Sequence, residues 1–358
     1  MGLCICLMSS GVGISVCINK KKLGDEMPKH QPIYIFYIIG SLWMYAASLL
    51  FAQLSVALGV EWGIFLNKTQ DISDLYHTDF TPAYWTFQIW PVIYIWFGGF
   101  LVYLVIGTCR RNSHDYVYVN PKIHTWVFFV FFMFNQGLNV GWVFLFDRQY
   151  MIPALAFVAL IAFTSYIVLF DSMRNLIVHY AELNLHQRGD IWATRILVHN
   201  GLAIYATWTS IATLLNLCLV LHYFADIDMD TATLISHVIV SAEIVFWVIF
   251  ENFIFDKYLR YTITIYPTAI VAYAGIIDEN WDPTKTTSIY ALVVLTVLSC
   301  LCVARFMLVI YRHIKLPIRV GPINDGPLSQ DDKEAIAREV QAQSMEMKAH
   351  NQSFKELP

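Results

Sequence analysis

Long apolar stretches, separated by short charged loops, dominate the pattern of hydrophobic and polar positions along the chain. Seven stretches carry no charged residue, and an eighth is interrupted only by Glu243. Most of them approach or exceed the roughly 20 residues that a helix needs to cross a hydrocarbon core of about 30 Å. We therefore expect an all-α integral membrane protein with about eight transmembrane helices, at 31–60, 82–109, 125–146, 149–170, 196–225, 231–250, 261–277 and 286–304. The stretch 261–277 is short and contains Pro267, so it fits a complete span least well.

The basic residues between these stretches predict the orientation of the chain. Lys and Arg concentrate in the cytoplasmic loops of membrane proteins. If the N-terminus is cytoplasmic, 19 of the 23 Lys and Arg residues fall in cytoplasmic segments, and Arg305 lies within the last span. The outward loops then hold only Lys68, Arg148 and Lys285. The distribution predicts cytoplasmic chain ends: a leader at 1–30 and a tail at 316–358. The tail carries a short helix at 330–348, which starts with Ser329 and Asp332 in capping-box spacing.

Composition excludes several classes of protein. The chain has 358 residues, a length typical of two soluble domains, but 57% of them are hydrophobic and only 14% are charged. No His and Cys residues stand at metal-ligand spacing, and there is no phosphate-binding glycine loop or basic face for nucleic acid. We expect a lipid bilayer as the surroundings, no metal, no cofactor, no catalytic residue and no nucleic-acid partner. None of the seven cysteines falls in an outward loop, which argues against structural disulfides.

The first outward loop contains a glycosylation sequon, Asn67-Lys68-Thr69. The outward loops are otherwise acidic. Together these features predict a glycoprotein of the plasma membrane or another membrane of the secretory pathway.

Three of the predicted spans carry a one-sided stripe of aromatic, amide and small residues. Residues three or four positions apart share a helix face. The stripes are Trp90, Tyr94 and Gly98; Asn135, Asn139 and Trp142; and Tyr205, Trp208, Ala212 and Asn216. An amide in lipid needs a hydrogen-bonding partner, so these faces must meet protein, water or a ligand. Packing between helices explains any single asparagine equally well. For three stripes together, a ligand pocket is the better interpretation.

The motifs in these stripes resemble those of the tryptophan-rich sensory protein family, also called the translocator-protein or TspO family. YATWTSIATLLN at 205–216 looks like the last helix of that family, NVGW at 139–142 like its third, and TPAYWTFQIWPVIYIWFG at 81–98 like its second. The resemblance covers about 33–222, and the first loop, DISDLYHTDFTPA, is similar to that of the longer bacterial members.

The resemblance implies a five-helix core at 31–225, three additional transmembrane helices at 226–315, and a homodimer. It also implies a pocket for a hydrophobic aromatic ligand, porphyrin-like or sterol-like, lined by Trp90, Asn139, Trp142, Tyr205, Trp208 and Ala212. The stripes add Tyr94 and Asn216 to this set. The chain departs from the family pattern in three ways. An early tryptophan is displaced to Trp85, the fifth helix ends without a basic residue, and the additional helices have no counterpart in short members.

We expect a protein that binds, senses or carries such a ligand. The alternatives are a membrane enzyme that acts on a tetrapyrrole-like ligand and a multi-span receptor. The resemblance also makes a mitochondrial membrane the alternative location.

Two charged residues lie within the predicted spans. An unpaired carboxylate at the bilayer centre costs about 3 kcal/mol on insertion scales, so Glu243 is expected to face the interior of the bundle. Arg305, His199 and His237 are its candidate partners. Glu243 is either a structural, hydrogen-bonded residue or a proton or ligand site in the additional helices.

Overall fold

The computed structural model describes residues 30–56, 58–112 and 115–318, and four positions of the tail, 334, 338, 341 and 345. Apart from one isolated bridge between Arg111 and Tyr116, helices are the only regular structure in this part of the chain. The predicted leader, except His30, and most of the predicted tail helix lie outside the described residues. The four described tail positions are helical.

Seven helical segments of the described chain are long and apolar enough to cross a membrane, which confirms the predicted all-α, multi-pass class. They are α1 (Pro32–Leu54), η1 (Tyr84–Gln88) with α4 (Ile89–Cys109), α5 (Trp126–Asp147), α6 (Met151–Val178), α8 (Arg188–Ala193) with η2 (Thr194–His199) and α9 (Asn200–Phe224), α10 (Met229–Ile249) with η3 (Phe250–Ile254), and α13 (Thr286–Lys315). Two of the junctions, η2 and η3, are π-helical turns.

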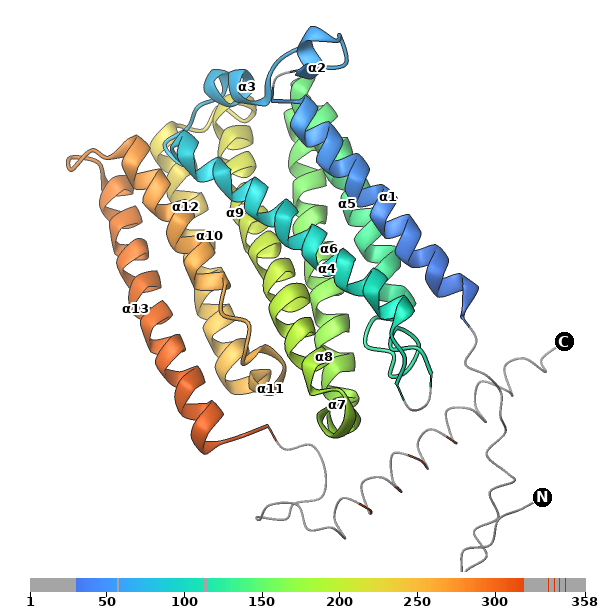
Figure 1. Ribbon diagram of the computed structural model, residues 1–358. Coiled ribbons are helices and arrows are strands. Elements are labelled where there is room, and N and C mark those ends of the chain that lie inside the picture. The colour runs from blue at the N-terminus through green and yellow to red at the C-terminus, as the bar shows by residue number, and fades with distance from the viewer. Residues whose placement is uncertain are drawn as a thin grey trace, which may run out of the picture.

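The eighth expected span, 261–277, is the short helix α12 (Ile265–Asn280). Its 16 residues extend about 24 Å at a rise of 1.5 Å per residue, less than the hydrocarbon core. The small helix α11 (Asp256–Leu259) and a partly buried connection, 260–264, precede α12. In Figure 1, α12 and this connection together run between the two ends of the bundle.

Helix α9 lies at the centre of the bundle (Figure 1). It packs against α4 and α6 on one side and against α10 and α12 on the other. More than half of its residues are buried, and they lie on all of its faces. A helix that is buried all round belongs in a core. α1 and α5 complete the group of five helices, because α1 packs on α4 and α5, and α5 packs on α6.

The two ends of the bundle differ in charge. One end, the acidic rim, contains α2 (Leu58–Glu61), α3 (Thr69–Leu75) and the residues Asp71, Asp79, Asp228 and Asp278. The other end, the basic rim, contains α7 (Tyr180–His186), α8, α11 and the residues Arg110, Arg188, Lys257 and Lys315. Figure 1 shows the acidic rim at the top and the basic rim at the bottom. The basic rim is the side predicted to be cytoplasmic.

Polar contacts at the acidic rim attach the additional helices to the five-helix core. They are Lys285 Nζ to Asp79 Oδ2 at 2.6 Å, Trp85 Nε1 to Asp278 Oδ2 at 2.9 Å, Asn280 Nδ2 to the Thr81 carbonyl at 2.7 Å, and the Ala83 amide to the Gly275 carbonyl at 3.0 Å. Gly275 allows α12 to approach η1, because a Cβ atom there would lie 2.1 Å from Thr86 Cγ2. Trp85, which departs from the family pattern, thus takes part in this junction.

Candidate functional site

Tyr205 is the residue around which the stripes of α4, α5 and α9 meet. Its side chain is 1% exposed. The rings of Phe97 and Trp90 pack on it edge to face, at centroid distances of 5.1 and 6.2 Å. Asn139 Nδ2 donates a hydrogen bond to the Tyr205 hydroxyl at 3.0 Å. The structure therefore brings one predicted residue from each stripe into a single cluster.

Tyr94 extends this cluster toward α1. Its ring stacks on Trp90 at 6.0 Å, and its hydroxyl lies 3.5 Å from Ser48 Oγ. The hydroxyl of Tyr45 donates to the Tyr94 carbonyl at 2.8 Å. Trp90 is only partly buried, whereas Tyr94 is 4% exposed. Trp90 is thus a partly accessible member of an otherwise buried group.

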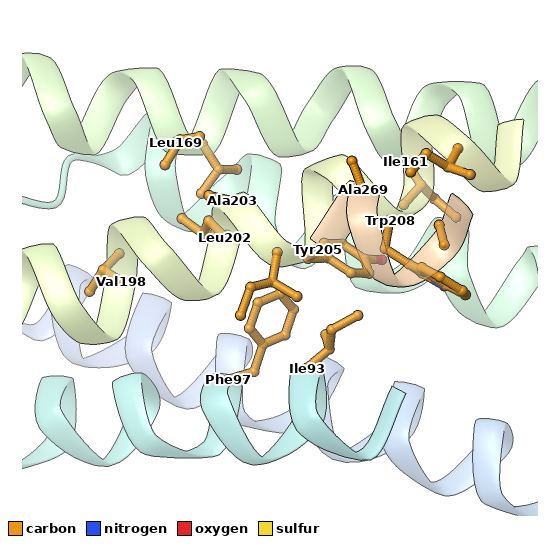
Figure 2. Packing of buried hydrophobic residues seen from close by; sticks show 14 of the residues in the cluster. Ile93, Phe97, Ile161, Leu169, Val198, Leu202, Ala203, Tyr205, Trp208 and Ala269 are labelled. Carbon is orange, nitrogen blue, oxygen red and sulfur yellow. The ribbon is translucent and has the colours of Figure 1, made fainter. Parts of the chain in front are cut away.

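Trp208 leaves α9 beside Tyr205, across from Ile93 and Phe97 of α4 (Figure 2). Its side chain is 4% exposed and meets the ring of Phe87 edge to face at 6.0 Å. Ala212, one turn further along α9, is partly buried. Trp208 and Ala212 lie on the same face of α9 as Tyr205, as the stripe predicts.

Trp142 and Asn216 lie nearer the acidic rim and each has a buried polar atom without a partner. Trp142 stacks on Phe146 at 5.0 Å and packs against a small cluster that includes Leu219, one turn beyond Asn216. Asn216 Nδ2 donates to the Ala212 carbonyl at 2.8 Å. Within the described chain, Trp142 Nε1 and Asn216 Oδ1 are buried and form no hydrogen bond. Buried polar atoms are usually satisfied by protein, water or ligand, so these two require an explanation.

Asn135 belongs to a different contact from Asn139. Its Nδ2 donates to the Ile161 carbonyl at 2.8 Å and lies within hydrogen-bonding distance of Thr164 and Ser165 on α6. The packing interpretation therefore applies to Asn135, which joins α5 to α6.

The expected pairing of Glu243 with Arg305 is wrong. The buried partner of Arg305 is Glu251, with 3.1 Å between Nε and Oε1 and side-chain exposures of 2% and 0%. The Tyr266 hydroxyl donates to Glu251 Oε2 at 2.8 Å, so η3, α12 and α13 meet at this pair. Arg305 also donates to Asn252 Oδ1 at 3.0 Å.

Glu243 is exposed, contrary to the expectation that it faces the interior of the bundle. Residues 241–250 contain no fully buried member, although Ile244, Trp247 and Val248 are partly buried against the core. Burial resumes at Glu251. The other candidate partners are also engaged elsewhere, His199 with Ser172 at 3.1 Å and His237 with Tyr273 at 3.2 Å.

The sequence pattern does not single out Glu251, because this residue stands just beyond the apolar stretch 231–250. The π-helical turn η3 carries it back into the bundle. Single π-helical turns occur frequently at functional sites.

Asn67 lies at the acidic rim and is partly buried. Its backbone amide donates to Asp147 Oδ1 at 2.8 Å, and its Nδ2 lies 3.4 Å from the Asp147 carbonyl. The sequon is therefore on the predicted outward face. The described residues contain no group of three or more His, Cys, Asp or Glu side chains that could hold a metal ion.

Comparison with known families identifies the chain. The profile of the family described as TSPO-like protein matches residues 35–304, which is 270 of 358 residues. This match extends well past the expected limit of the resemblance at 222 and includes α10, α12 and most of α13. Searches of curated proteins and of solved structures gave no match. The chain is a multi-pass integral membrane protein that belongs to the TSPO-like protein family.

Proposed function

We propose that this protein binds a flat, hydrophobic ligand, porphyrin-like or sterol-like, among α4, α5 and α9, and that it senses or carries this ligand in the membrane. The convergence of three aromatic stripes on Tyr205 supports the proposal, since aromatic rings pack well on flat apolar molecules. The polar members of the cluster fix orientation, as the few polar groups of apolar ligand pockets do.

The observation that carries the proposal is the pair of unpartnered polar atoms, Trp142 Nε1 and Asn216 Oδ1. One is a donor and the other an acceptor, and both belong to stripes that the family resemblance implicates. Leaving such an atom buried and unpaired costs about 1–3 kcal/mol. A sterol hydroxyl, or a pyrrole nitrogen and carboxylate of a porphyrin, would offer the complementary groups.

Binding is tested by quenching of tryptophan fluorescence in the purified protein, with tetrapyrroles, sterols and phospholipids as probes. Trp142→Phe removes the unpartnered N–H and keeps an aromatic ring on Phe146. We expect this change to weaken binding of the preferred probe about tenfold, equivalent to about 1.4 kcal/mol.

Trp247→Phe is the matched control. Trp247 is also partly buried, and its Nε1 also has no hydrogen-bond partner among the described residues, but it lies on α10. This variant should bind the probe as the unaltered protein does. Equal losses in the two variants, or no saturable quenching by any probe, would refute the pocket.

A second pair of variants on α9 addresses the same point. Trp208→Ala removes a ring from the cluster, whereas Thr207→Ala changes the neighbouring residue on another face of the helix. We expect a loss of at least tenfold for the first and little change for the second. Because Trp208 is buried, thermal unfolding of both variants must be measured alongside binding.

We also propose that the protein resides in a membrane of the secretory pathway and forms a homodimer. Asn67 at the acidic rim supports the location. Glycosidase treatment should then reduce the apparent mass, and Asn67→Gln should abolish that shift. An unchanged mass and co-sedimentation with mitochondria would favour the mitochondrial alternative. Light scattering of the detergent-solubilised protein distinguishes a dimer from a monomer.

A further inference from the structure

A cavity of about 420 Å³ lies at the basic rim, outside the aromatic cluster. It is formed by the turn that follows α4 and by the segment that joins α7 to α8. Its volume is within the range of small-molecule sites. The lining residues are Arg110, Arg111, Asn112, Val117, His186, Gln187, Arg188, Gly189 and Asp190.

The lining of this cavity is strongly cationic. Three guanidinium groups face one carboxylate, which leaves a net charge of +2 when His186 is neutral. Arginine is the side chain best suited to phosphate, because its planar fork of N–H donors matches two phosphate oxygens. Basic residues are expected at this rim in any case, so charge alone does not define a site.

Each of the three arginines contacts a polar neighbour. Arg110 donates two hydrogen bonds to Asp190 at 2.7 and 2.9 Å, Arg111 donates to the Tyr116 hydroxyl at 2.5 Å, and Arg188 Nε donates to Asn184 Oδ1 at 3.1 Å. Arg188 uses only one of its five N–H groups in this contact and is exposed. Donors therefore remain available in the cavity.

Gln187 indicates that a ligand of this cavity must also donate a hydrogen bond. Its Oε1 is buried and accepts no hydrogen bond within the described chain. The fully ionised phosphate ester of a headgroup only accepts hydrogen bonds, so the phosphate group by itself does not satisfy this oxygen. A ligand that carries both phosphate and hydroxyl groups satisfies the arginines and Gln187 together.

The position of the cavity indicates where such a ligand comes from. Helix α4 ends at Cys109, and the lining begins with the next residue, so the cavity lies at the level of lipid headgroups. Basic pockets at the cytoplasmic ends of transmembrane helices bind phosphoinositide headgroups. We propose that the cavity between the α4 turn and the α7–α8 segment binds the headgroup of a phosphorylated inositol lipid.

The experiment uses the full chain in lipid nanodiscs. Binding is measured for discs that contain a phosphatidylinositol bisphosphate, and for discs with phosphatidylserine at equal total charge. We expect a clear preference for the inositol lipid. Arg188→Gln should reduce its binding at least fivefold, while Arg174→Gln, at an exposed position near the same rim but outside the lining, should change it less than twofold.

Gln187→Leu separates recognition of the hydroxyls from recognition of charge. It should lower the preference for the inositol lipid over phosphatidylserine without changing the net charge of the protein. Equal effects of Arg188→Gln and Arg174→Gln, or no preference at equal charge, would overturn the proposal.

Free inositol trisphosphate distinguishes the source of the ligand. If it binds as tightly as the lipid, the cavity is a phosphoinositol site but its assignment to a lipid is wrong. Retained thermal stability of each variant shows that a loss of binding does not reflect unfolding.

Discussion

Two groups of helices differ in the contacts at their centres: α1, α4, α5, α6 and α9, the predicted core, and α10, α12 and α13, the predicted addition. In the core, α4, α5 and α9 meet through aromatic rings and an amide–hydroxyl hydrogen bond around Tyr205. In the addition, η3, α12 and α13 meet at the buried ion pair of Glu251 and Arg305. Many small neutral contacts share the stability of the core. The predicted addition also contains one fully buried pair of charges, and each charge is costly if the other is removed.

The largest expected effect is the loss of that ion pair. Glu251→Leu leaves Arg305 buried without its carboxylate and should lower the free energy of unfolding by about 3–5 kcal/mol. Chemical unfolding in detergent measures this change. The double variant Glu251→Leu with Arg305→Leu should recover much of the loss, because both charges are then gone.

Glu243→Leu is the matched control, the same substitution on the same helix. Glu243 is exposed to the membrane side of α10 and has no ion-pair partner among the described residues, so this variant should not be destabilised. A loss as large as that of Glu251→Leu would show that the destabilisation is not specific to the Glu251–Arg305 pair.

The next effect concerns the junction between the two regions. Gly275→Ala places a Cβ atom 2.1 Å from Thr86 Cγ2, and this overpacking should cost about 1–3 kcal/mol. In Gly99→Ala the nearest atom to the new Cβ is 3.9 Å away, so that variant should be neutral or slightly stabilised through helix propensity. Thermal unfolding of both variants compares the junction with the core. If both alanines are tolerated, α12 does not pack on η1 as described.

An effect of similar size is expected for the hydrogen bond at the centre of the core. Tyr205→Phe leaves the buried Asn139 amide without its partner and should cost about 1–3 kcal/mol. The same change in an Asn139→Leu background should cost much less, because no donor is left unpaired. A double-mutant cycle on unfolding free energies gives the coupling between the two side chains. Zero coupling would contradict the contact.

The smallest effect belongs to the exposed ion pair of Lys285 and Asp79. The side chains are 41% and 19% exposed, so Lys285→Met should cost only about 0.2–1 kcal/mol. Hydrogen bonding to Asp79 raises the pKa of Lys285 above its ordinary value. The contribution is therefore fully present below the ordinary lysine pKa and is lost as the pH rises through the raised one. Unfolding measured from neutral to strongly alkaline pH should show this loss in the unaltered protein but not in the variant.

The sequence by itself determined the class, the spans and the faces of the three stripes. Charge-free length predicted about eight crossing helices, because lipid admits no unpaired backbone over that distance. Seven helical segments of the described chain are long and apolar enough to cross. Helical periodicity placed Trp90, Asn139 and Tyr205 on inward faces, and the structure brings these three side chains together. The expected pocket stays a prediction until binding is measured.

The tertiary structure alone decided which residues meet across elements. Helical periodicity assigns a residue to one face of its own helix, but it does not say which neighbour covers that face or where coverage stops. For this reason Glu243 is exposed, whereas Glu251 pairs with Arg305 through a π-helical turn that no spacing rule predicts. The same limit applies to the cavity at the basic rim, where Arg111 and Arg188 stand 77 positions apart in sequence and converge only because two separate turns pack together.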